Sequence, residues 1–150
     1  MVSSKAGHRI WEGPYGDGSS RKNILASCDQ SLKRTSLEYF DIFYSHRYDG
    51  QTPIEETVSA LADIVRQGKA LYVGLSKYPL DVLQKAYDCL KEAGVPCLAS
   101  QYRYNMIDRE IEGGIMDTAS RSGSGLVIFS PLAQGILTDK YLHGIPADSR

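Results

Sequence analysis

The sequence predicts an α/β fold of repeated strand–helix units, with about five parallel strands and intervening helices. Short apolar runs that each end on a polar residue recur every 25 to 30 residues, at 41–46, 71–76, 97–101 and 126–130. That interval fits one strand, one helix and two loops, and continuous apolar runs are typical of parallel strands. A closed eight-stranded barrel typically takes about 250 residues, and five strands leave two unpaired edges. The 150 residues of this chain therefore predict either a fragment of a (β/α)8 TIM barrel, which we favour, or a sheet whose edges a partner covers.

A short strand, 1–5, is expected before the first of these runs, followed by a loop rich in glycine and proline, 7–18. A helix is expected next, because apolar residues recur at the four-residue spacing of one helical face. Ser19 or Ser20 is suited to cap its amino terminus. The apolar residues of that face are Ile24, Cys28 and Leu32.

The second helix has the clearest local signals. Thr52-Pro53-Ile54-Glu55 is typical of a capping box with proline at the first helical position. Gly68 is a suitable terminator. The apolar stripe of this helix consists of Ile54, Val58, Leu61 and Val65.

Two further helices are expected between the later strands. One opens near Pro79 and ends at Gly94, and the other covers 108–120. The latter is weakened by Gly113 and Gly114, each of which costs about 1 kcal/mol relative to alanine in a helix interior. One more short helix is expected around residues 138–142. The apolar face of the helix that opens near Pro79 carries Leu83, Tyr87 and Leu90.

The composition excludes several classes of partner and site. A formal net charge of −1 carries no signal for nucleic acid or for an acidic membrane surface. No apolar run approaches the roughly 20 residues of a membrane span, and the first residues lack the pattern of a signal peptide. The three cysteines form no CxxC pair. We therefore expect a cytoplasmic protein with free cysteines, no metal site, no nucleic-acid partner and no membrane span.

Two ionisable residues end the first two predicted strands. Lys5 ends the first strand and His46 ends the second, so both are expected at the edge of the sheet where TIM-barrel enzymes carry their active sites. Taken singly, a lysine and a histidine at such positions are more often ordinary surface or core residues. The motifs around them favour a functional role.

Several segments, in order along the chain, resemble motifs of the aldo-keto reductase family. They are Ser3–Gly7, Asp41–Arg47, Gly68–Ser76 and Phe129–Gly135. The loop Gly13–Gly16 and the tail Gly144–Arg150 resemble one branch of that family. This branch contains bacterial glyceraldehyde-3-phosphate reductases and the β subunits of voltage-gated potassium channels. The resemblance covers essentially the whole chain.

The resemblance implies an oxidoreductase that reduces aldehydes or ketones, including small phosphorylated aldehydes, to alcohols with NADPH. The catalytic tetrad of the family is Asp, Tyr, Lys and His, and here Lys5 matches the lysine and His46 the histidine. Both roles are physically reasonable. An ammonium group lowers the pKa of a neighbouring tyrosine, which is near 10 in a free side chain, and a histidine can hydrogen-bond the substrate oxygen.

The resemblance also implies residues that bind the carboxamide of the nicotinamide. Ser76 and Gln101 match the side chains that hydrogen-bond this group. Lys77 stands where many family members have asparagine, and the channel β subunits also carry a basic residue at this position. The change weakens one carboxamide contact without excluding the cofactor.

The remaining implied cofactor residues follow the last strand. Phe129 matches the aromatic residue that stacks on the nicotinamide ring. Ser130 and Leu132 match the loop whose backbone meets the pyrophosphate. The expected ligands are therefore NADPH and a small-molecule carbonyl substrate, and homo-oligomerisation is left open.

By this resemblance, residues 1–150 form a partial aldo-keto reductase barrel, roughly strands 3 to 7, without the first two units and the last. The tetrad Asp and Tyr of the family belong to units before Lys5. We therefore expect the chain alone to show no appreciable NADPH-dependent carbonyl reduction. Two alternatives stay open: a non-catalytic barrel fragment that binds a nucleotide or a protein partner, and a pseudogene product without a stable fold.

Overall fold

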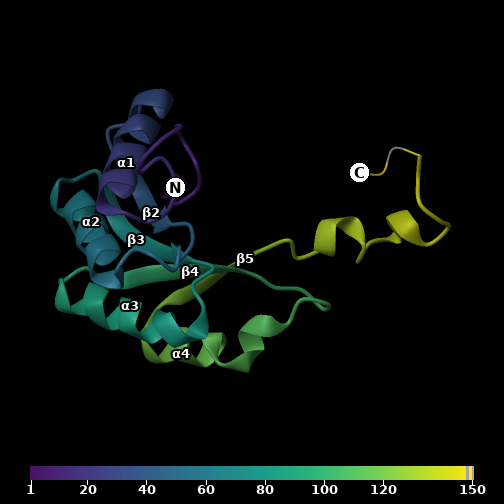
Figure 1. Cartoon of the computed structure of the whole chain (residues 1–150). Helices are drawn as coiled ribbons and strands as arrows, with labels where there is room; N and C mark the ends of the chain where they lie inside the picture. Colours follow the sequence, from purple (N-terminus) through teal and green to yellow (C-terminus); the bar gives the residue numbers. More distant parts are fainter. Residues whose placement is uncertain (148, 150) are drawn as a thin grey trace.

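The computed structural model describes residues 1–147 and residue 149, so Asp148 and Arg150 of the tail motif lie outside the described residues. Five parallel strands form one sheet in which each strand pairs with the next along the chain (Figure 1). This arrangement confirms the predicted α/β fold with about five parallel strands and intervening helices. The strands are β1 (Ser3–Ala6), β2 (Phe40–Ser45), β3 (Ala70–Ser76), β4 (Cys97–Arg103) and β5 (Gly125–Phe129).

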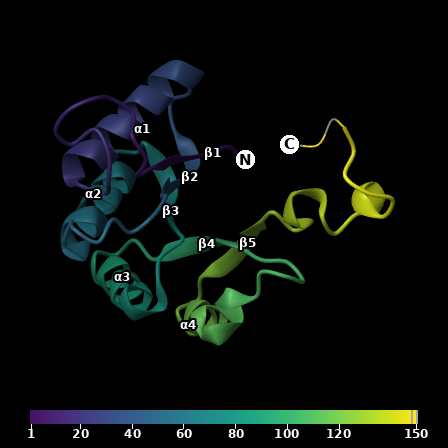
Figure 2. The same cartoon turned by 45° about the vertical axis from the view of Figure 1, so that its right-hand side comes forward.

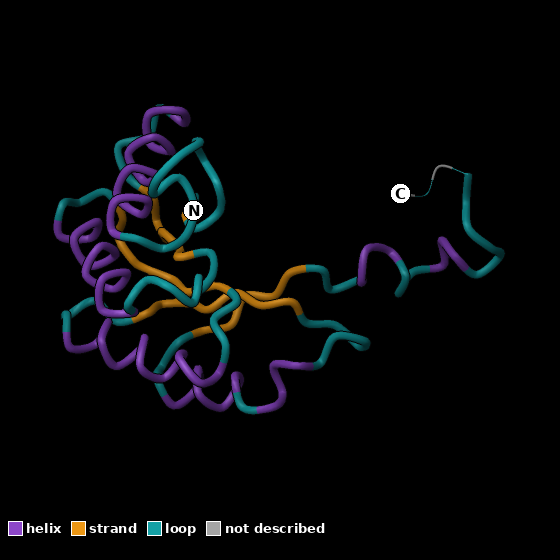
Figure 3. The backbone as a smooth tube through the Cα atoms, viewed as in Figure 1, coloured by secondary structure: helices purple, strands orange, loops and turns teal. Residues whose placement is uncertain are grey.

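The α-helices all lie along the convex face of a strongly curved sheet, as Figures 1 and 2 show. Right-handed crossovers produce this layer when each new parallel strand is added on the same side of the sheet. Figure 3 shows the resulting alternation of strands and helices along the chain. The arrangement is that of a segment of barrel wall. The helices are α1 (Arg21–Thr35), α2 (Ile54–Arg66), α3 (Leu80–Glu92) and α4 (Ile115–Arg121).

The hydrophobic core lies between the sheet and these helices. Phe43, Val73 and Leu75 are completely buried, because alternate residues of a strand point to opposite faces of the sheet. The predicted apolar faces of the first three helices are confirmed, although Leu32 and Val65 at their ends are only half-buried. The fully buried helix residues include Ile24, Cys28, Leu61, Ile64, Leu83, Ala86 and Leu90.

The capping box predicted at the start of α2 is wrong. The helix begins one residue after Pro53, and no side chain caps it. The Thr52 hydroxyl instead donates to Asp49 Oδ2 at 2.8 Å, because the Asp49 carboxylate is the acceptor that organises the preceding turn. Glu55 forms an ion pair with a lysine of α3. The predicted terminator is confirmed, since Gly68 follows the C-cap residue Gln67 and has a φ of +71°.

The single helix predicted over residues 108–120 is broken in two. A 3-10 helix, η1 (Glu110–Gly113), precedes α4, and Gly114 between them has a φ of +121°. A β-carbon on Gly114 would lie 2.9 Å from Leu80 Cδ2. Glycine therefore allows both the turn and the close approach to α3. Helix propensity indicated that the two glycines weaken this segment, but it did not predict that the helix is interrupted at Gly114.

After β5 the chain leaves the sheet and extends away from it (Figures 1 and 2). It forms two 3-10 helices, η2 (Ala133–Gly135) and η3 (Asp139–Tyr141). The second lies within the helix predicted around residues 138–142, whereas the first was not predicted. Across residues 1–147 and 149, no helix has the length and apolar character needed to cross a membrane.

Candidate active site

The candidate catalytic and cofactor-binding residues lie at the edge of the sheet where the strands end, here called the carboxyl edge. Because all five strands are parallel, their ends meet on one side of the molecule. The predicted clustering at one end of a curved parallel sheet is therefore observed. The residues are Lys5 in β1, His46 directly after β2, Ser76 and Lys77 at and after the end of β3, Gln101 in β4, and Phe129, Ser130 and Leu132 at and after the end of β5.

The side chains of Lys5 in β1 and Gln101 in β4 meet, although β2 and β3 lie between these strands in the sheet. The Lys5 ammonium donates to Gln101 Oε1. In a flat sheet, β1 and β4 would be three strand spacings apart, or about 14 Å. The contact therefore depends on the curvature of the sheet, which Figure 2 shows. It holds an ammonium group over the concave face at the carboxyl edge.

The surroundings of Lys5 are partly apolar and cationic. Burial and the nearby Lys77 lower the pKa of the Lys5 ammonium. The Lys5 Nζ atom lies 5.9 Å from the centroid of the Tyr44 ring. Burial raises the pKa of the Tyr44 phenol, so this tyrosine is poorly suited to donate a proton to a developing alkoxide.

His46 lies at the carboxyl edge as a neutral imidazole. Burial, followed by the charges of His8, Lys5, Lys77 and Arg47, lowers the pKa of His46 to about 4. The His46 ring meets the His8 ring edge to face, with centroids 4.3 Å apart and planes at 86°. A neutral imidazole carries one N–H donor, which suits a hydrogen bond to a carbonyl oxygen.

Ser76 and Lys77 join β3 to β4 through one carbonyl group. Ser76 Oγ and the Lys77 backbone N–H each donate to the Gln101 carbonyl at 3.1 Å. Ser76 is completely buried, so its hydroxyl ties the strands together in this structure. The side-chain NH₂ group of Gln101 donates to no group within residues 1–147 and 149. Gln101 therefore has a free amide donor for a carboxamide, whereas the Ser76 hydroxyl is already used.

Phe129 lies against two cationic side chains. Lys77 Nζ is 5.3 Å and Arg103 Cζ is 5.8 Å from the centroid of its ring. Neither cation forms an ion pair with any described carboxylate. Cations near an aromatic face are attracted by its quadrupole. The ring and its two cations together form a surface that favours an anionic ligand.

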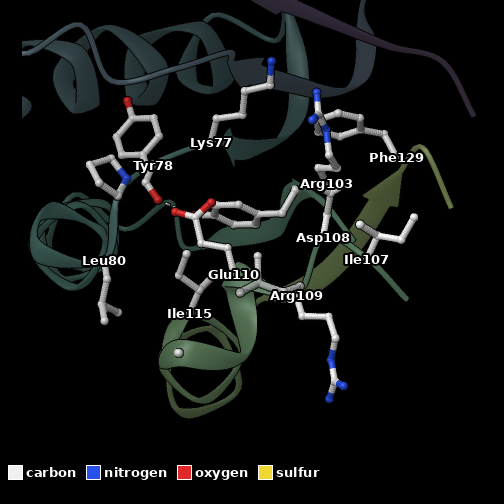
Figure 4. Close-up of a pocket in the computed structure, with 14 residues that line it drawn as sticks. Lys77, Tyr78, Leu80, Arg103, Ile107, Asp108, Arg109, Glu110, Ile115 and Phe129 are labelled. Carbon is white, nitrogen blue, oxygen red and sulfur yellow. Dashed lines mark hydrogen bonds between the residues drawn. The ribbon is translucent and has the colours of Figure 1, made fainter. Parts of the chain in front are cut away.

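A cavity of about 750 Å³ opens beside these three side chains (Figure 4). Its other walls come from the start of α3, from η1 and from α4, which place Leu80, Glu110 and Ile115 around it. Within its lining, the hydroxyl of Tyr102 donates to the carbonyl of Tyr78 at 2.7 Å. The cavity therefore extends from Phe129 and its two cations at the carboxyl edge to the start of α3 and to η1 and α4.

The turn after β5 has a backbone that fits a phosphate group. Ser130 has a φ of +55°, and Ala133 and Gln134 are also left-handed. The backbone N–H groups of Ser130 and Leu132 donate to no described acceptor. Pro131 between these two residues has no N–H of its own, so Ser130 and Leu132 offer two separate donors to an anion. The local geometry thus suits the pyrophosphate contact expected of these two residues.

Asn105 contacts the candidate residue Ser130 and was not identified from the sequence. Its Oδ1 atom accepts the N–H groups of Ile107 at 2.9 Å and Asp108 at 2.8 Å. Its Nδ2 group donates to Asp108 at 2.9 Å and to the Ser130 carbonyl at 3.0 Å. Asn105 therefore fixes the turn after β5 from the end of β4. Asparagine followed three residues later by aspartate was the available signal, and it indicates only a local turn.

Comparisons with known proteins agree with this geometry. The family model described as "Aldo/keto reductase family" matches residues 1–150. The L-glyceraldehyde 3-phosphate reductase of Escherichia coli (strain K12) is 56% identical over 151 residues, covering 100% of this chain and 44% of that protein. The probable voltage-gated potassium channel subunit beta of Oryza sativa subsp. japonica is 39% identical, covering 100% of this chain and 46% of that protein.

A solved structure of an aldo-keto reductase is also similar to this chain. The crystal structure of a thermostable aldo-keto reductase in complex with the inhibitor epalrestat has a TM-score of 0.73 and 33% identity. The match covers 81% of this chain and 44% of that chain. The chain thus spans less than half the length of the curated relatives it matches.

Proposed function

The chain belongs to the aldo/keto reductase family, and we propose that it forms the central part of an NADPH-dependent reductase of aldehydes and ketones. In this proposal, residues 1–150 form a partial barrel, roughly strands 3 to 7. The contact between Lys5 and Gln101 carries the proposal, because it joins a proposed catalytic side chain to a proposed cofactor ligand over the concave face. Small phosphorylated aldehydes are the proposed substrates, since the reductase of E. coli is named for one.

Lys5 and His46 are the proposed catalytic residues. The Lys5 ammonium would lower the pKa of a tyrosine that protonates the developing alkoxide. His46, whose pKa is lowered to about 4, would donate its single N–H to the substrate oxygen and orient the carbonyl. Such positioned donors act most strongly on charge that develops in the transition state.

The remaining residues are proposed to hold NADPH, which supplies the hydride. Gln101 offers its free NH₂ group to the carboxamide, with Ser76 as its partner once that hydroxyl becomes accessible. Phe129 stacks on the nicotinamide ring. The backbone N–H groups of Ser130 and Leu132 bind the pyrophosphate.

Lys77 adds a positive charge next to the proposed position of the nicotinamide ring. In this role it attracts the anionic cofactor but does not distinguish NADPH from NADH, because the phosphate that separates the two is carried by the adenosine ribose. A cytoplasmic location is also part of the proposal, supported by three free cysteines, Cys28, Cys89 and Cys97.

A chimeric enzyme tests the proposal. Residues 1–150 replace the matching segment of the E. coli reductase, which then supplies the rest of the barrel. We expect NADPH-dependent reduction of small aldehydes, measured by the loss of nicotinamide absorbance. The same chimera with Lys5→Met should lose most of this turnover and keep its thermal unfolding temperature.

The alternative of a non-catalytic binding role has its own outcome in this experiment. A chimera that folds and quenches or shifts NADPH fluorescence on binding, but reduces no aldehyde in a panel with and without phosphate, would favour that alternative. Equal turnover of the Lys5→Met and unsubstituted chimeras would remove Lys5 from the mechanism.

A further inference from the structure

Two imidazole rings meet at the carboxyl edge, and only one of them matches a family motif. His8 comes from the loop after β1, whereas His46 directly follows β2. Their ring centroids are 4.3 Å apart and their planes are nearly perpendicular, at 86°. In such an arrangement the positive edge of one aromatic ring meets the negative face of the other. Rotation of either ring about its Cβ–Cγ bond would lose this contact.

The backbone holds His8 against His46 from the preceding residues. The His46 N–H donates to the Ala6 carbonyl at 2.7 Å, and Arg47 Nε donates to the Gly7 carbonyl at 2.8 Å. Gly7 has a φ of +132°, and a β-carbon on it would lie 3.4 Å from His46 Cβ. The chain can therefore turn closely over His46 at this point, which places the next residue beside the His46 ring.

A second connection closes the loop that carries His8. The Arg47 guanidinium contacts both carboxylate oxygens of Asp17, at 2.8 and 3.0 Å. Both contacts come from Nη2, while Nε of the same guanidinium donates to the Gly7 carbonyl, so one side chain holds both ends of the loop. Residues 7–17 are thereby tied at both ends to the residue that follows His46.

The charged groups around the two rings are mostly cationic. Lys5 from β1, Lys77 after β3 and Arg47 after β2 all act on the imidazole of His46 and, with burial and His8, lower its pKa. Burial, Arg47 and Lys77 lower the pKa of His8, and Asp17 partly opposes them. Both rings are therefore neutral at pH 7. The contact between them is a packing contact that two charged rings would not make.

We propose that His8 is a positioning residue that sets the plane of the His46 ring at the carboxyl edge. The effect of His8 on catalysis rests on the proposed reductase function, whereas the contact between the two rings is observed in this chain. A neutral imidazole must present its single N–H in one direction to hold a carbonyl oxygen. The edge-to-face contact with His8 restricts the His46 ring to that plane.

The first experiment uses the chain itself and needs no activity. Nuclear magnetic resonance of the imidazole groups follows His46 in the unsubstituted chain and in His8→Ala, His8→Phe and His143→Ala. The phenyl ring of His8→Phe keeps an edge-to-face partner. His143 is the matched control, because it is exposed like His8 but contacts no aromatic ring among the described residues. We expect cross-peaks between the two rings in the unsubstituted chain and in His8→Phe. In His8→Ala the His46 ring should average its orientation and titrate at a higher pH.

The second experiment places the same substitutions in the chimeric reductase. His8→Ala should lower kcat by about 10- to 100-fold, the cost of a misplaced reacting group, with little change in KM. His8→Phe should recover most of the kcat of the unsubstituted chimera. The acid limb of its pH profile should differ from that of the unsubstituted chimera, because His8 no longer titrates beside His46.

The two experiments separate failure of this inference from failure of the proposed function. An inactive unsubstituted chimera would contradict the function, while ring cross-peaks in the chain would still support the pairing. His46 signals that are identical in His8→Ala and the unsubstituted chain would overturn the positioning role. So would a His8→Phe chimera as slow as His8→Ala.

Discussion

The ring of Tyr44 occupies the space beside Gly74 that the β-carbon of any other residue would fill. The two residues are register partners in neighbouring strands β2 and β3. A β-carbon on Gly74 would overlap the Tyr44 ring and would lie 2.7 Å from the carbonyl oxygen of Ala99. Glycine at this position therefore lets a large side chain cover the middle of the sheet.

Replacing Gly74 by alanine should destabilise the fold. Tyr44 or the backbone of β4 would have to move, and overpacking of this kind costs about 1–3 kcal/mol. Urea unfolding of Gly74→Ala should show a lower midpoint with an unchanged slope. Gly125→Ala is the matched control, because a β-carbon there would meet only the Leu98 carbonyl oxygen at an ordinary 3.6 Å. Equal midpoints for the two variants would contradict the steric argument.

His46 should make the fold less stable as the pH falls from neutral. Its pKa in the folded chain is lowered to about 4, whereas an unfolded histidine titrates near 6.5. Between these values the unfolded state binds more protons, so stability decreases as the pH is lowered through this window. The urea midpoint should fall less steeply from pH 7 to pH 4.5 in His46→Gln than in the unsubstituted chain. Parallel slopes would show that the folded-state pKa of His46 is not lowered.

His46→Ala in the chimeric reductase should chiefly lower turnover. Its proposed contact is with the substrate oxygen and not with the cofactor, and the loss of one such donor typically costs about 10²–10³ in kcat. Binding of NADPH, measured by fluorescence titration, should change little. Unchanged turnover would exclude His46 from the mechanism.

Asn105→Ala should loosen the turn that is proposed to bind pyrophosphate. The substitution removes both hydrogen bonds to the backbone of Ile107 and Asp108 and the bond to the Ser130 carbonyl. In the chimera we expect weaker NADPH binding with a smaller effect on reduced nicotinamide mononucleotide, which lacks the pyrophosphate. Met106→Ala serves as the control, because that side chain is 83% exposed. Equal losses for both ligands would argue against an effect through the turn.

Phe129→Leu should weaken cofactor binding, and Phe129→Tyr should retain it. Leucine has no aromatic face for the nicotinamide ring or for Lys77 and Arg103, whereas tyrosine keeps one. The ratio of NADPH dissociation constants for the two variants in the chimera measures the contribution of stacking. A ratio near one would mean that the ring of Phe129 does not contact the cofactor.

The sequence by itself determined the five strands, the order of strands and helices, and the edge at which the polar strand-ending residues gather. Apolar runs and helical spacing are local properties, and parallel strands joined by right-handed crossovers share one direction. Lys5, His46 and Gln101 could therefore be assigned to one edge before any distance was known. The family resemblance added the roles proposed for them.

Only the tertiary structure decided which side chains meet at that edge. The Lys5–Gln101 contact depends on sheet curvature, and the His8–His46 pair depends on a glycine turn beside a neighbouring strand. Such contacts depend on distances of a few ångströms between side chains, which curvature and packing set and which local sequence patterns do not contain.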